Sequence, residues 1–385
     1  MLLDGTSNEI AADRTNILRL YGALEKSDTQ IVYYDPGVGT LGPEGSAFWL
    51  KRKAAEVWGL MTGWGLDANV KQAYRFLMHN YDDGKCDGEQ DRVRDEIHIF
   101  GFSRGAYSAR VLAGFIHAVG LLDVRNENLL DYAYRAYKRV GIDGDANDFA
   151  EVRLYERILR ADRPPIRFLG LFDTVASVIE HGRTGLRLKS HAFTNENRSV
   201  ESVAHAVAID DRRTMFTPQL WPAPAEYWGN PFNSADAKLQ EIHEVWFAGS
   251  HGDVGGGHPE ADSALAKVPL VWMIDRAKEC GLTFKTRTIN SVILGDKQSG
   301  VSRYVKPNPF ARLNNSMSFG WALLEFIPRS KPKRSKRRSF LGLVVPFFER
   351  RGIPPNATLH RSVIDRMASD DYDPDNLPTD YEVSD

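Results

Sequence analysis

The segment Gly101-Phe102-Ser103-Arg104-Gly105 constrains the fold more than any other part of this sequence. It fits the pattern Gly-x-Ser-x-Gly, follows a β-branched and aromatic strand pattern at 96–100 and precedes a stretch with small and apolar residues at helical spacing. Glycine is required where a backbone passes close to its neighbours. A serine between two such glycines, at a turn from a strand into a helix, is typical of an exposed nucleophile. The alternative interpretation is a tight strand-to-helix turn without chemistry.

The rest of the chain alternates strand and helix patterns. Short runs rich in β-branched and aromatic residues predict strands at 30–34, 96–100, 166–172 and 244–249, and helical spacing predicts helices over 66–81 and 261–279. Strands that alternate with helices favour an α/β fold of the α/β-hydrolase type, with a mainly parallel central sheet covered by helices on both faces. We expect one catalytic domain over 1–327 with a helical insertion at about 125–163, which is also the natural candidate for a lid. Residues 328–385 are expected to form a basic loop and a C-terminal extension that packs on the same domain.

Composition excludes several classes of protein. The 385 residues are 42% hydrophobic and 26% charged, which is typical of a globular chain and excludes wholesale disorder. A formal net charge of −2 gives no general reason to expect a nucleic-acid partner, and two cysteines, Cys86 and Cys280, cannot form a disulfide framework. The N-terminus has no basic segment followed by an apolar one. We therefore expect a cytoplasmic protein, with export by a route independent of a signal peptide as the alternative.

A serine hydroxyl is a weak nucleophile and needs a histidine base that a carboxylate orients. In α/β hydrolases these residues follow one another in the order Ser, Asp or Glu, His. Asp173 comes directly after the strand at 166–172, and His251 lies in a glycine-rich loop after the strand at 244–249. The amide of Arg104 would lie at a helix N-terminus, where it can donate to an oxyanion. The spacing predicts a triad of Ser103, Asp173 and His251 that needs no cofactor and no resident metal.

Other roles for the same residues stay open. Asp173 also fits a turn or a helix N-cap. His251, Asp253 and His258 could together bind a divalent metal ion, which would make the protein a metal-dependent hydrolase. His205 and His360 are weaker candidates for the base. A third hypothesis is a non-catalytic interaction module.

Several further motifs occur in a fixed order and resemble a known family. The family is the α/β-hydrolase domain of type VI secretion phospholipase effectors, which also occurs in stand-alone proteins. The resemblance extends from about residue 2 to about residue 280 and is weaker at 359–363. Its motifs are Asp4-Gly5-Thr6-Ser7-Asn8, Thr15-Asn16-Ile17, and the segments 33–40, 63–69, 101–107, 172–175 and 245–257.

This resemblance implies a serine esterase that acts on phospholipid acyl esters. It implies Ser103 as the nucleophile, Asp173 as the orienting acid and His251 as the base, with Asp253 as the alternative acid. The turn at Asp4-Gly5-Thr6 would then supply the second oxyanion amide, from Gly5 or Thr6. If the chain is an effector, the resemblance also implies a secretion apparatus or an immunity protein as a partner.

A basic run lies beside an apolar one near the C-terminus. Arg329–Arg338 contains seven basic residues and precedes the apolar segment Phe340–Phe348. Cationic side chains next to apolar ones can bind an anionic membrane surface, and this would bring a lipid esterase to its substrate. The alternative is a solvated loop followed by a core strand. No recognition motif for nucleic acid accompanies the run. Residues 371–385 are acidic and rich in turn formers, and predict a frayed tail.

Overall fold

The structure is a computed structural model that describes most of the chain. The described residues are 1–5, 13–37, 65–84, 93–140, 152, 154–155, 157–159, 161–175, 178–182, 185–189, 191–228, 237–296, 303–330, 335, 337–340, 343–369 and 372–385. Thr6 and Cys86, which the sequence analysis names, lie outside these residues. In the described part of the chain, no helix combines the length and the apolarity needed to cross a bilayer.

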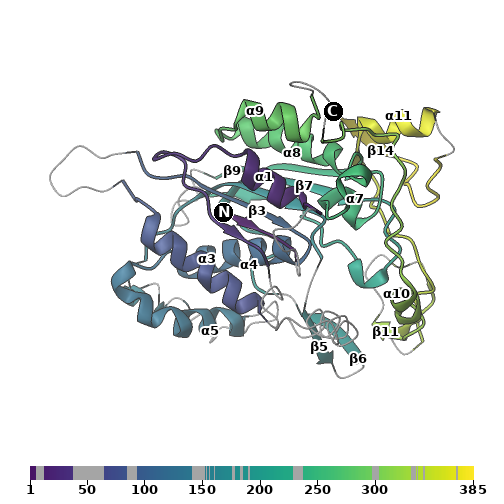
Figure 1. The fold of residues 1–385 in the computed structure, drawn as a ribbon. Coiled ribbons are helices and arrows are strands. Elements are labelled where there is room, and N and C mark those ends of the chain that lie inside the picture. Colours follow the sequence, from purple (N-terminus) through teal and green to yellow (C-terminus); the bar gives the residue numbers. More distant parts are fainter. Residues whose placement is uncertain are drawn as a thin grey trace, which may run out of the picture.

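A central sheet of eight strands organises the molecule (Figure 1). Its order is β14-β13-β10-β7-β4-β3-β1-β2, and every pairing is parallel. The strands are β1 (Leu2–Leu3), β2 (Tyr34–Asp35), β3 (Ile97–Phe102), β4 (Ile166–Phe172), β7 (Val200–Ala208), β10 (Glu241–Phe247), β13 (Ala357–His360) and β14 (Tyr381–Ser384). The prediction of an α/β fold with a parallel central sheet is confirmed. Because all the strands run the same way, their carboxyl ends meet at one edge of the sheet.

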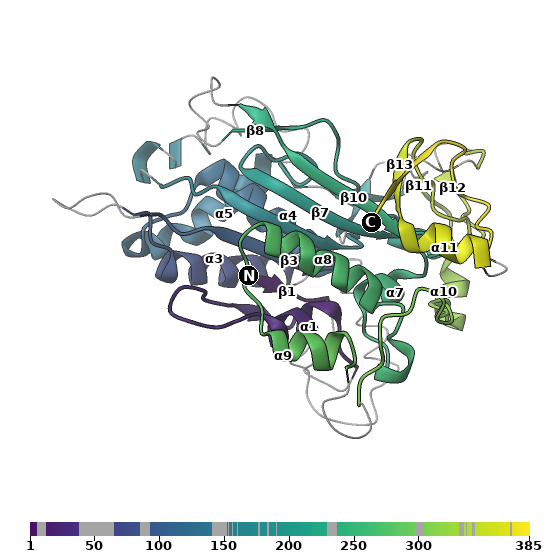
Figure 2. The same ribbon diagram turned by 90° about the horizontal axis from the view of Figure 1, so that it is seen from above.

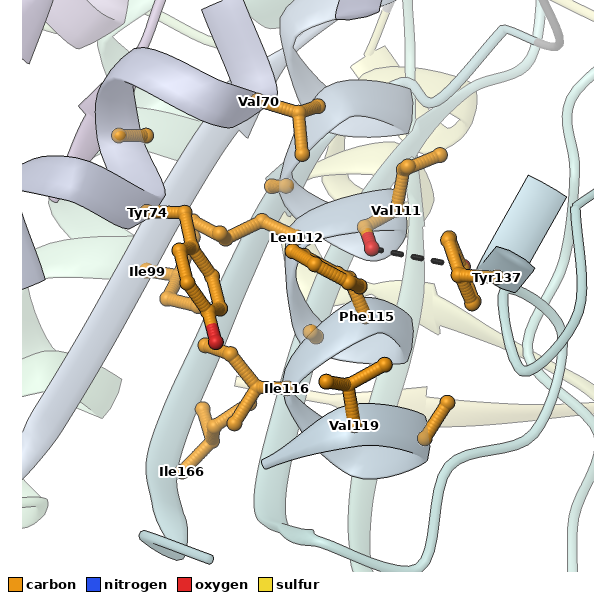
Figure 3. Packing of buried hydrophobic residues seen from close by; sticks show 14 of the residues in the cluster. Val70, Tyr74, Ile99, Val111, Leu112, Phe115, Ile116, Val119, Tyr137 and Ile166 are labelled. Atoms are coloured by element: carbon orange, nitrogen blue, oxygen red, sulfur yellow. Dashed lines mark hydrogen bonds between the residues drawn. The ribbon is translucent and has the colours of Figure 1, made fainter. Parts of the chain in front are cut away.

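One face of the sheet is covered by α3 (Leu66–Asn80), α4 (Arg104–Val119) and α5 (Leu130–Val140), which follows the 3₁₀ turn η2 (Val124–Leu129). Figure 3 shows the apolar packing between these helices and the sheet. The rings of Tyr74 and Phe115 lie 4.6 Å apart, and Tyr137 of α5 packs beside Phe115. The buried side of α5 therefore makes this part of the predicted insertion a core helix, and it is not a lid over the carboxyl edge.

The opposite face carries α1 (Asn16–Ala23), α8 (Lys267–Glu279), α9 (Thr286–Thr288) and the π turn η6 (Ile289–Ile293). The side-chain amide of Asn16 donates to the carbonyl oxygens of Val254 and Ala266, 2.8 Å away in each case, and so joins α1 to the segment before α8. Two predicted bounds are too wide. The strand expected at 30–34 contributes only its last residue to β2, since Gln30 bonds to Glu25 and Thr283 instead. The helix expected from 261 begins at Lys267.

The C-terminal region adds two strands to the edge of the sheet beside β10 (Figure 2). The frayed tail predicted for 371–385 is wrong, because β14 pairs with β13 along all four of its residues. The helix α11 (Arg361–Ser369) follows β13 and packs beside this edge. The remaining elements are α7 (His251–Gly255), α10 (Phe319–Leu324), the 3₁₀ turns η3 (Thr214–Phe216) and η5 (Glu260–Asp262), and the strand pairs β5 (Val178–Gly182) with β6 (Gly185–Lys189), β8 (Glu226–Tyr227) with β9 (Lys238–Leu239), and β11 (Arg329–Ser330) with β12 (Leu343–Val344).

Candidate active site

Ser103 lies at the turn from β3 into α4 in a strained backbone conformation. Its φ is 57° and its ψ is −120°, in the region that non-glycine residues rarely occupy. The two flanking glycines are required by close packing: a Cβ at Gly101 would lie 2.5 Å from the Cα of Ala106, and one at Gly105 would lie 2.1 Å from the carbonyl oxygen of Leu3. The turn thereby holds a partly exposed serine at the carboxyl edge of the sheet.

Asp173 lies beside Ser103 because β3 and β4 are parallel neighbours. Phe102 pairs with Phe172, so the residue after each strand comes at the same level, and the Ser103 amide donates to the carbonyl oxygen of Phe172 at 3.0 Å. Asp173 is fully buried and has a positive φ of 40°. Its Oδ1 accepts a hydrogen bond of 3.0 Å from the amide of Ala208.

His251 begins α7, which follows β10. Its Nδ1 lies 2.5 Å from Oδ2 of Asp173. The imidazole packs 4.7 Å from the ring of Phe102 and 4.9 Å from the ring of Phe216, measured between ring centroids. Since Phe102 directly precedes Ser103, all three residues that the sequence analysis grouped lie at one end of the sheet. Gly255, one turn further along, allows this packing, because a Cβ there would overlap the Phe102 ring.

Burial and neighbouring charges act in opposite directions on this pair. Burial raises the pKa of the Asp173 carboxyl, but the Arg351 guanidinium and the bond to His251 outweigh that effect and hold this pKa well below its usual range. Burial lowers the pKa of His251, and the hydrogen bond to Asp173 opposes the shift without cancelling it. The arrangement therefore favours an ionised aspartate beside a neutral imidazole at neutral pH.

The segment after β7 contributes a second ion pair, between Asp211 and Arg213, beside the imidazole of His251. Asp211 accepts the main-chain amide of His251 at 3.1 Å and the guanidinium of Arg213 at 2.6 Å. Burial raises the pKa of Asp211, but Arg213 reverses the shift and brings it to about 2. The same guanidinium stacks over the ring of Phe216, and Trp321 of α10 packs edge-on against that ring. These contacts extend an aromatic border from the imidazole of His251 through Phe216 to Trp321 of α10.

Asp253, the alternative acid, has different partners. Its Oδ2 accepts the amide and the hydroxyl of Ser250, and thus caps α7. Its Oδ1 accepts the side-chain amide of Asn314 at 2.6 Å, and His258 Nε2 lies 3.8 Å from the same oxygen. In the structure, Asp173 binds the His251 ring, whereas Asp253 caps α7. Among the described residues, no group of three or more His, Cys, Asp or Glu side chains is placed to hold a metal ion.

The residues suggested for an oxyanion hole lie next to the serine. Arg104 is the first residue of α4, so its amide lies in the first turn of that helix. The Asp4-Gly5 turn at the end of β1 touches Gly105, whose Cβ would lie 2.4 Å from the carbonyl oxygen of Asp4. In this structure the Gly5 amide donates to Oδ1 of Asp4 at 2.7 Å. Thr6, the other suggested donor, lies outside the described residues.

The two weaker base candidates lie in other environments. His205 is buried inside β7, where its Nδ1 lies 3.0 Å from Oε2 of Glu244 and its Nε2 accepts the amide of Thr174. His360 ends β13, stacks on Phe247 and bonds to Ser362. Burial lowers the pKa of His205, and it lowers that of His360 to about 4. Neither imidazole contacts Asp173 through a hydrogen bond.

Arg351 is the residue that sequence reasoning missed. It lies in the C-terminal extension and is 6% exposed. Its Nη1 donates to Oδ1 of Asp173 at 2.6 Å and its Nη2 donates to Oδ2 at 2.8 Å. It stands 178 residues from Asp173 in the sequence and belongs to no recognisable motif. No signal in a single sequence separates it from the other basic residues of this region.

Comparisons with known proteins place most of the chain in one family. The family model described as "T6SS, Phospholipase effector Tle1-like, catalytic domain" matches residues 1–276. The uncharacterized protein YEL023C of Saccharomyces cerevisiae is 34% identical over 239 residues, which are 59% of this chain and 33% of the yeast protein. The chain thus spans about a third of that relative. Arg351 lies outside the matched residues 1–276.

Two solved structures are similar to this chain. An uncharacterized protein from Pseudomonas aeruginosa gives a TM-score of 0.41 at 18% identity, over 74% of this chain and 46% of that one. A Tle1 effector bound to the VgrG spike of the type VI secretion system gives a TM-score of 0.32 at 20% identity, over 65% of this chain and 42% of that one. The chain spans less than half of either structure.

Proposed function

The chain belongs to the family of Tle1-like catalytic domains of type VI secretion phospholipase effectors, and from this premise we propose that it is a serine esterase that cleaves phospholipid acyl esters. Family membership supports a phospholipase-like hydrolase. The observation that carries the finer proposal is the hydrogen bond between Asp173 and His251, at the same end of the sheet as the strained Ser103.

The proposed chemistry follows from the position of each group. Asp173 accepts the Nδ1 proton of His251, so Nε2 is left as the basic nitrogen that takes the proton of the Ser103 hydroxyl. The serine oxygen attacks the ester carbonyl, and the imidazolium then gives its proton to the leaving alcohol. A water molecule, deprotonated by the same imidazole, releases the fatty acid from the acyl-enzyme.

Charge that develops on the carbonyl oxygen needs hydrogen-bond donors. The N-terminus of α4 points its dipole at this position, and we propose the Arg104 amide as one donor. The turn at Gly5 and Thr6 is proposed as the second. The Gly5 amide must leave Oδ1 of Asp4 to take this role. Thr15 and Tyr34, which bind the other carboxylate oxygen, would keep the Asp4 side chain in place during that change.

Turnover of a p-nitrophenyl ester tests the chemistry. We expect Ser103→Ala to remove turnover to the level of the buffer, while the melting temperature stays close to that of the wild type. Turnover that survives in Ser103→Ala would contradict the proposal. Turnover that EDTA abolishes and Zn²⁺ restores in the same variant would favour the metal-dependent alternative at the 251–258 loop.

We also propose that an anionic membrane surface is a partner. The cluster that we name the apolar rim carries exposed side chains on and after α10 and around β12: Leu323, Phe326, Ile327, Phe340 and Phe347. Phe326 and Phe347 pack 5.5 Å apart, and Arg337 lies over the Phe347 ring, so a cation adjoins the apolar surface. Residues 331–334 and 336 of the basic run lie outside the described part of the chain. Phe340 is 81% exposed, whereas Val344 of β12 is buried, so the described part of 340–348 combines an exposed apolar residue with a buried strand residue.

The apolar rim is joined to the candidate site by aromatic contacts. Trp321 lies on the same helix as Leu323 and packs on Phe216, which in turn packs on His251. A membrane bound at the rim would therefore lie close to the proposed base. Each basic residue near an anionic surface contributes roughly 1 kcal/mol.

Sedimentation with vesicles tests the membrane proposal. We expect binding to vesicles that contain phosphatidylglycerol and weak binding to phosphatidylcholine alone. The variant Arg337→Glu/Arg338→Glu should lose most of the difference between the two vesicles, and Phe326→Ser/Ile327→Ser should weaken binding to both. Equal binding by all variants would contradict the proposal. The pair Lys278→Glu/Lys285→Glu, on the α8 side of the molecule, is the matched control for charge and should bind like the wild type.

Further partners and the compartment follow from the family premise and are also proposals. We propose synthesis in the cytoplasm and, for a chain that is exported as an effector, binding to the secretion apparatus and to an immunity protein. Co-purification with the VgrG spike of the same organism tests the first of these partners, and its failure would favour a housekeeping role.

A further inference from the structure

We infer that Arg351 is a positioning residue for the proposed reaction: it holds the Asp173 carboxylate in the orientation that His251 requires and balances its charge. The inference rests on the proposed function and extends it, because it makes the C-terminal region part of the site. The family match ends at residue 276, so this residue belongs to a part of the chain that the match does not cover.

The geometry is that of a bidentate pair. Each terminal nitrogen of Arg351 donates to one oxygen of Asp173, at 2.6 and 2.8 Å. Such a fork fixes the plane of the carboxylate, whereas a point charge would not. Since Oδ2 also accepts from Nδ1 of His251, fixing that plane fixes the direction of the bond to the imidazole.

Arg351 is itself held in place from several sides. Its Nη1 donates to the carbonyl oxygen of Ala208 at 2.8 Å, and its Nη2 donates to that of Phe216 at 2.6 Å. Its own carbonyl oxygen accepts the side-chain amide of Asn376 at 3.1 Å. Arg351 therefore ties the end of β7, the main chain at Phe216 and the C-terminal region to one carboxylate.

The charge of Arg351 also sets the proton affinity of the Asp173–His251 pair. A buried carboxylate without a cation draws a proton, which either it or the adjacent imidazole then holds. Arg351 holds the pKa of the Asp173 carboxyl well below its usual range, and burial lowers the pKa of the adjacent His251 imidazole. Without Arg351, the unbalanced carboxylate stabilises the imidazolium. The pair then keeps its proton to a higher pH, and the base is lost over that range.

Other charged groups face the same pair and define the background of the experiment. They come from β7 and from the segment that follows β7. Asp211 and Arg213 oppose each other beside His251, Asp210 acts on Arg351, and His205 lies behind Asp173. These groups stay in place in the variants below, so a difference between wild type and variant reports on Arg351.

The variants are Arg351→Met and Arg351→Lys, with Arg366→Met as the matched control. Arg366 is also a buried arginine of the C-terminal region, 4% exposed, and it donates to the carbonyl oxygens of Pro309 and Ala311. A purely structural role for Arg351 predicts that Arg351→Met and Arg366→Met behave alike, with a lower melting temperature and an unchanged titration.

The first readout is the titration of the His251 imidazole by NMR, with the resonance assigned by its loss in His251→Gln. We expect Arg351→Met to raise the pKa of His251 by about 1 unit or more, because removal of a cation beside a carboxylate acts on this scale. The acid limb of kcat/KM should move to higher pH by the same amount. We expect kcat to fall roughly 10- to 100-fold with little change in KM, since a misaligned base costs about this much.

The lysine variant separates charge from geometry. We expect Arg351→Lys to restore the pKa of His251 most of the way to its wild-type value. It should restore only part of kcat, because one ammonium cannot bind both oxygens in a fork. If Arg351→Met does not fold, Arg351→Lys alone tests the inference, and a kcat equal to that of the wild type would overturn it.

An unchanged His251 titration in folded Arg351→Met would also overturn the inference. These outcomes differ from a failure of the proposed function. If the wild-type chain hydrolyses no ester, the esterase proposal fails, while the NMR titration still tests the effect of Arg351 on the pair. If esterase activity depends on Ser103 but not on Arg351, only the further inference fails.

Discussion

Two fully buried aspartates lie close to the start of α7, and the charges around them differ. Asp173, at the end of β4, is bound by His251 and by the Arg351 guanidinium. Asp253, inside the first turn of α7, is bound by the amide and hydroxyl of Ser250 and by Asn314. Both carboxylates have several donors, so the number of hydrogen bonds does not distinguish them.

The difference lies in what each carboxylate holds. Asp253 binds neutral donors and fixes the backbone where α7 begins, as expected of a helix cap. Asp173 binds one titratable ring and one permanent cation, which is the arrangement that orients a base and keeps it neutral. One region sets the position of the helix, and the other sets the protonation of the imidazole that the helix carries.

The largest expected effect is the loss of activity when Asp173, and not Asp253, is changed. Asp173→Asn keeps the shape of the side chain but removes the charge that orients Nδ1 of His251. We expect kcat to fall roughly 10³- to 10⁴-fold, as for the loss of the acid from a catalytic triad. Ester turnover at saturating substrate measures this. A loss below tenfold would mean that Asp173 does not act on His251 during turnover.

The pH profile gives the second effect. Burial lowers the pKa of His251, and the bond to Asp173 opposes this only in part. Because the base must be neutral, activity should fall as the pH drops through this lowered value, and the acid limb should lie below the ordinary histidine value of about 6.5. Asp253→Asn should leave the limb where it is. A limb that moves with Asp253 would reverse the assignment of the two aspartates.

A smaller effect is expected on stability at the cap. Asp253→Asn removes the carboxylate that accepts the Ser250 amide and hydroxyl, so we expect the free energy of unfolding to fall by about 0.5–2 kcal/mol. Activity per folded molecule should change much less than in Asp173→Asn. Urea unfolding followed by circular dichroism measures the first quantity, and active-site titration normalises the second. Equal stability of variant and wild type would argue against the cap.

The smallest effect concerns the residue that binds Asp253 from outside α7. Asn314→Ala removes a donor 2.6 Å from Oδ1 while the Ser250 bonds remain. We expect a loss of about 1 kcal/mol in the free energy of unfolding, as for one hydrogen bond to a charged group near the surface. Thermal unfolding of this variant beside Asp253→Asn checks the order. A larger loss in Asn314→Ala would place the main role of Asp253 outside the cap.

The sequence predicts the parts of the fold and the site that depend on local rules. Ser103 is found because its glycines are required by backbone packing at one turn, and Asp173 because it directly follows a strand. Chain order adds His251. The alternatives at Asp253 and His258 could not be separated by sequence, since spacing within one loop does not reveal which carboxylate faces a ring.

The parts that escape prediction depend on contacts distant in the sequence. Arg351 reaches Asp173 from the far end of the chain. The strand β14 lies in the acidic segment 371–385, and its order depends on pairing with β13. The central strand β7 is rich in alanine and carries a buried histidine, so its composition indicates a strand only weakly. In each case the tertiary partner determines the structure.

Labelling with a fluorophosphonate tests the central claim most directly, because the reagent reacts with an activated serine whatever the natural substrate is. We predict that mass spectrometry finds the adduct on Ser103 of the wild type, that Asp173→Asn and His251→Gln react far more slowly, and that Asp253→Asn reacts at nearly the wild-type rate. An adduct on another residue, or a Ser103 that reacts equally well in Asp173→Asn, would contradict the account.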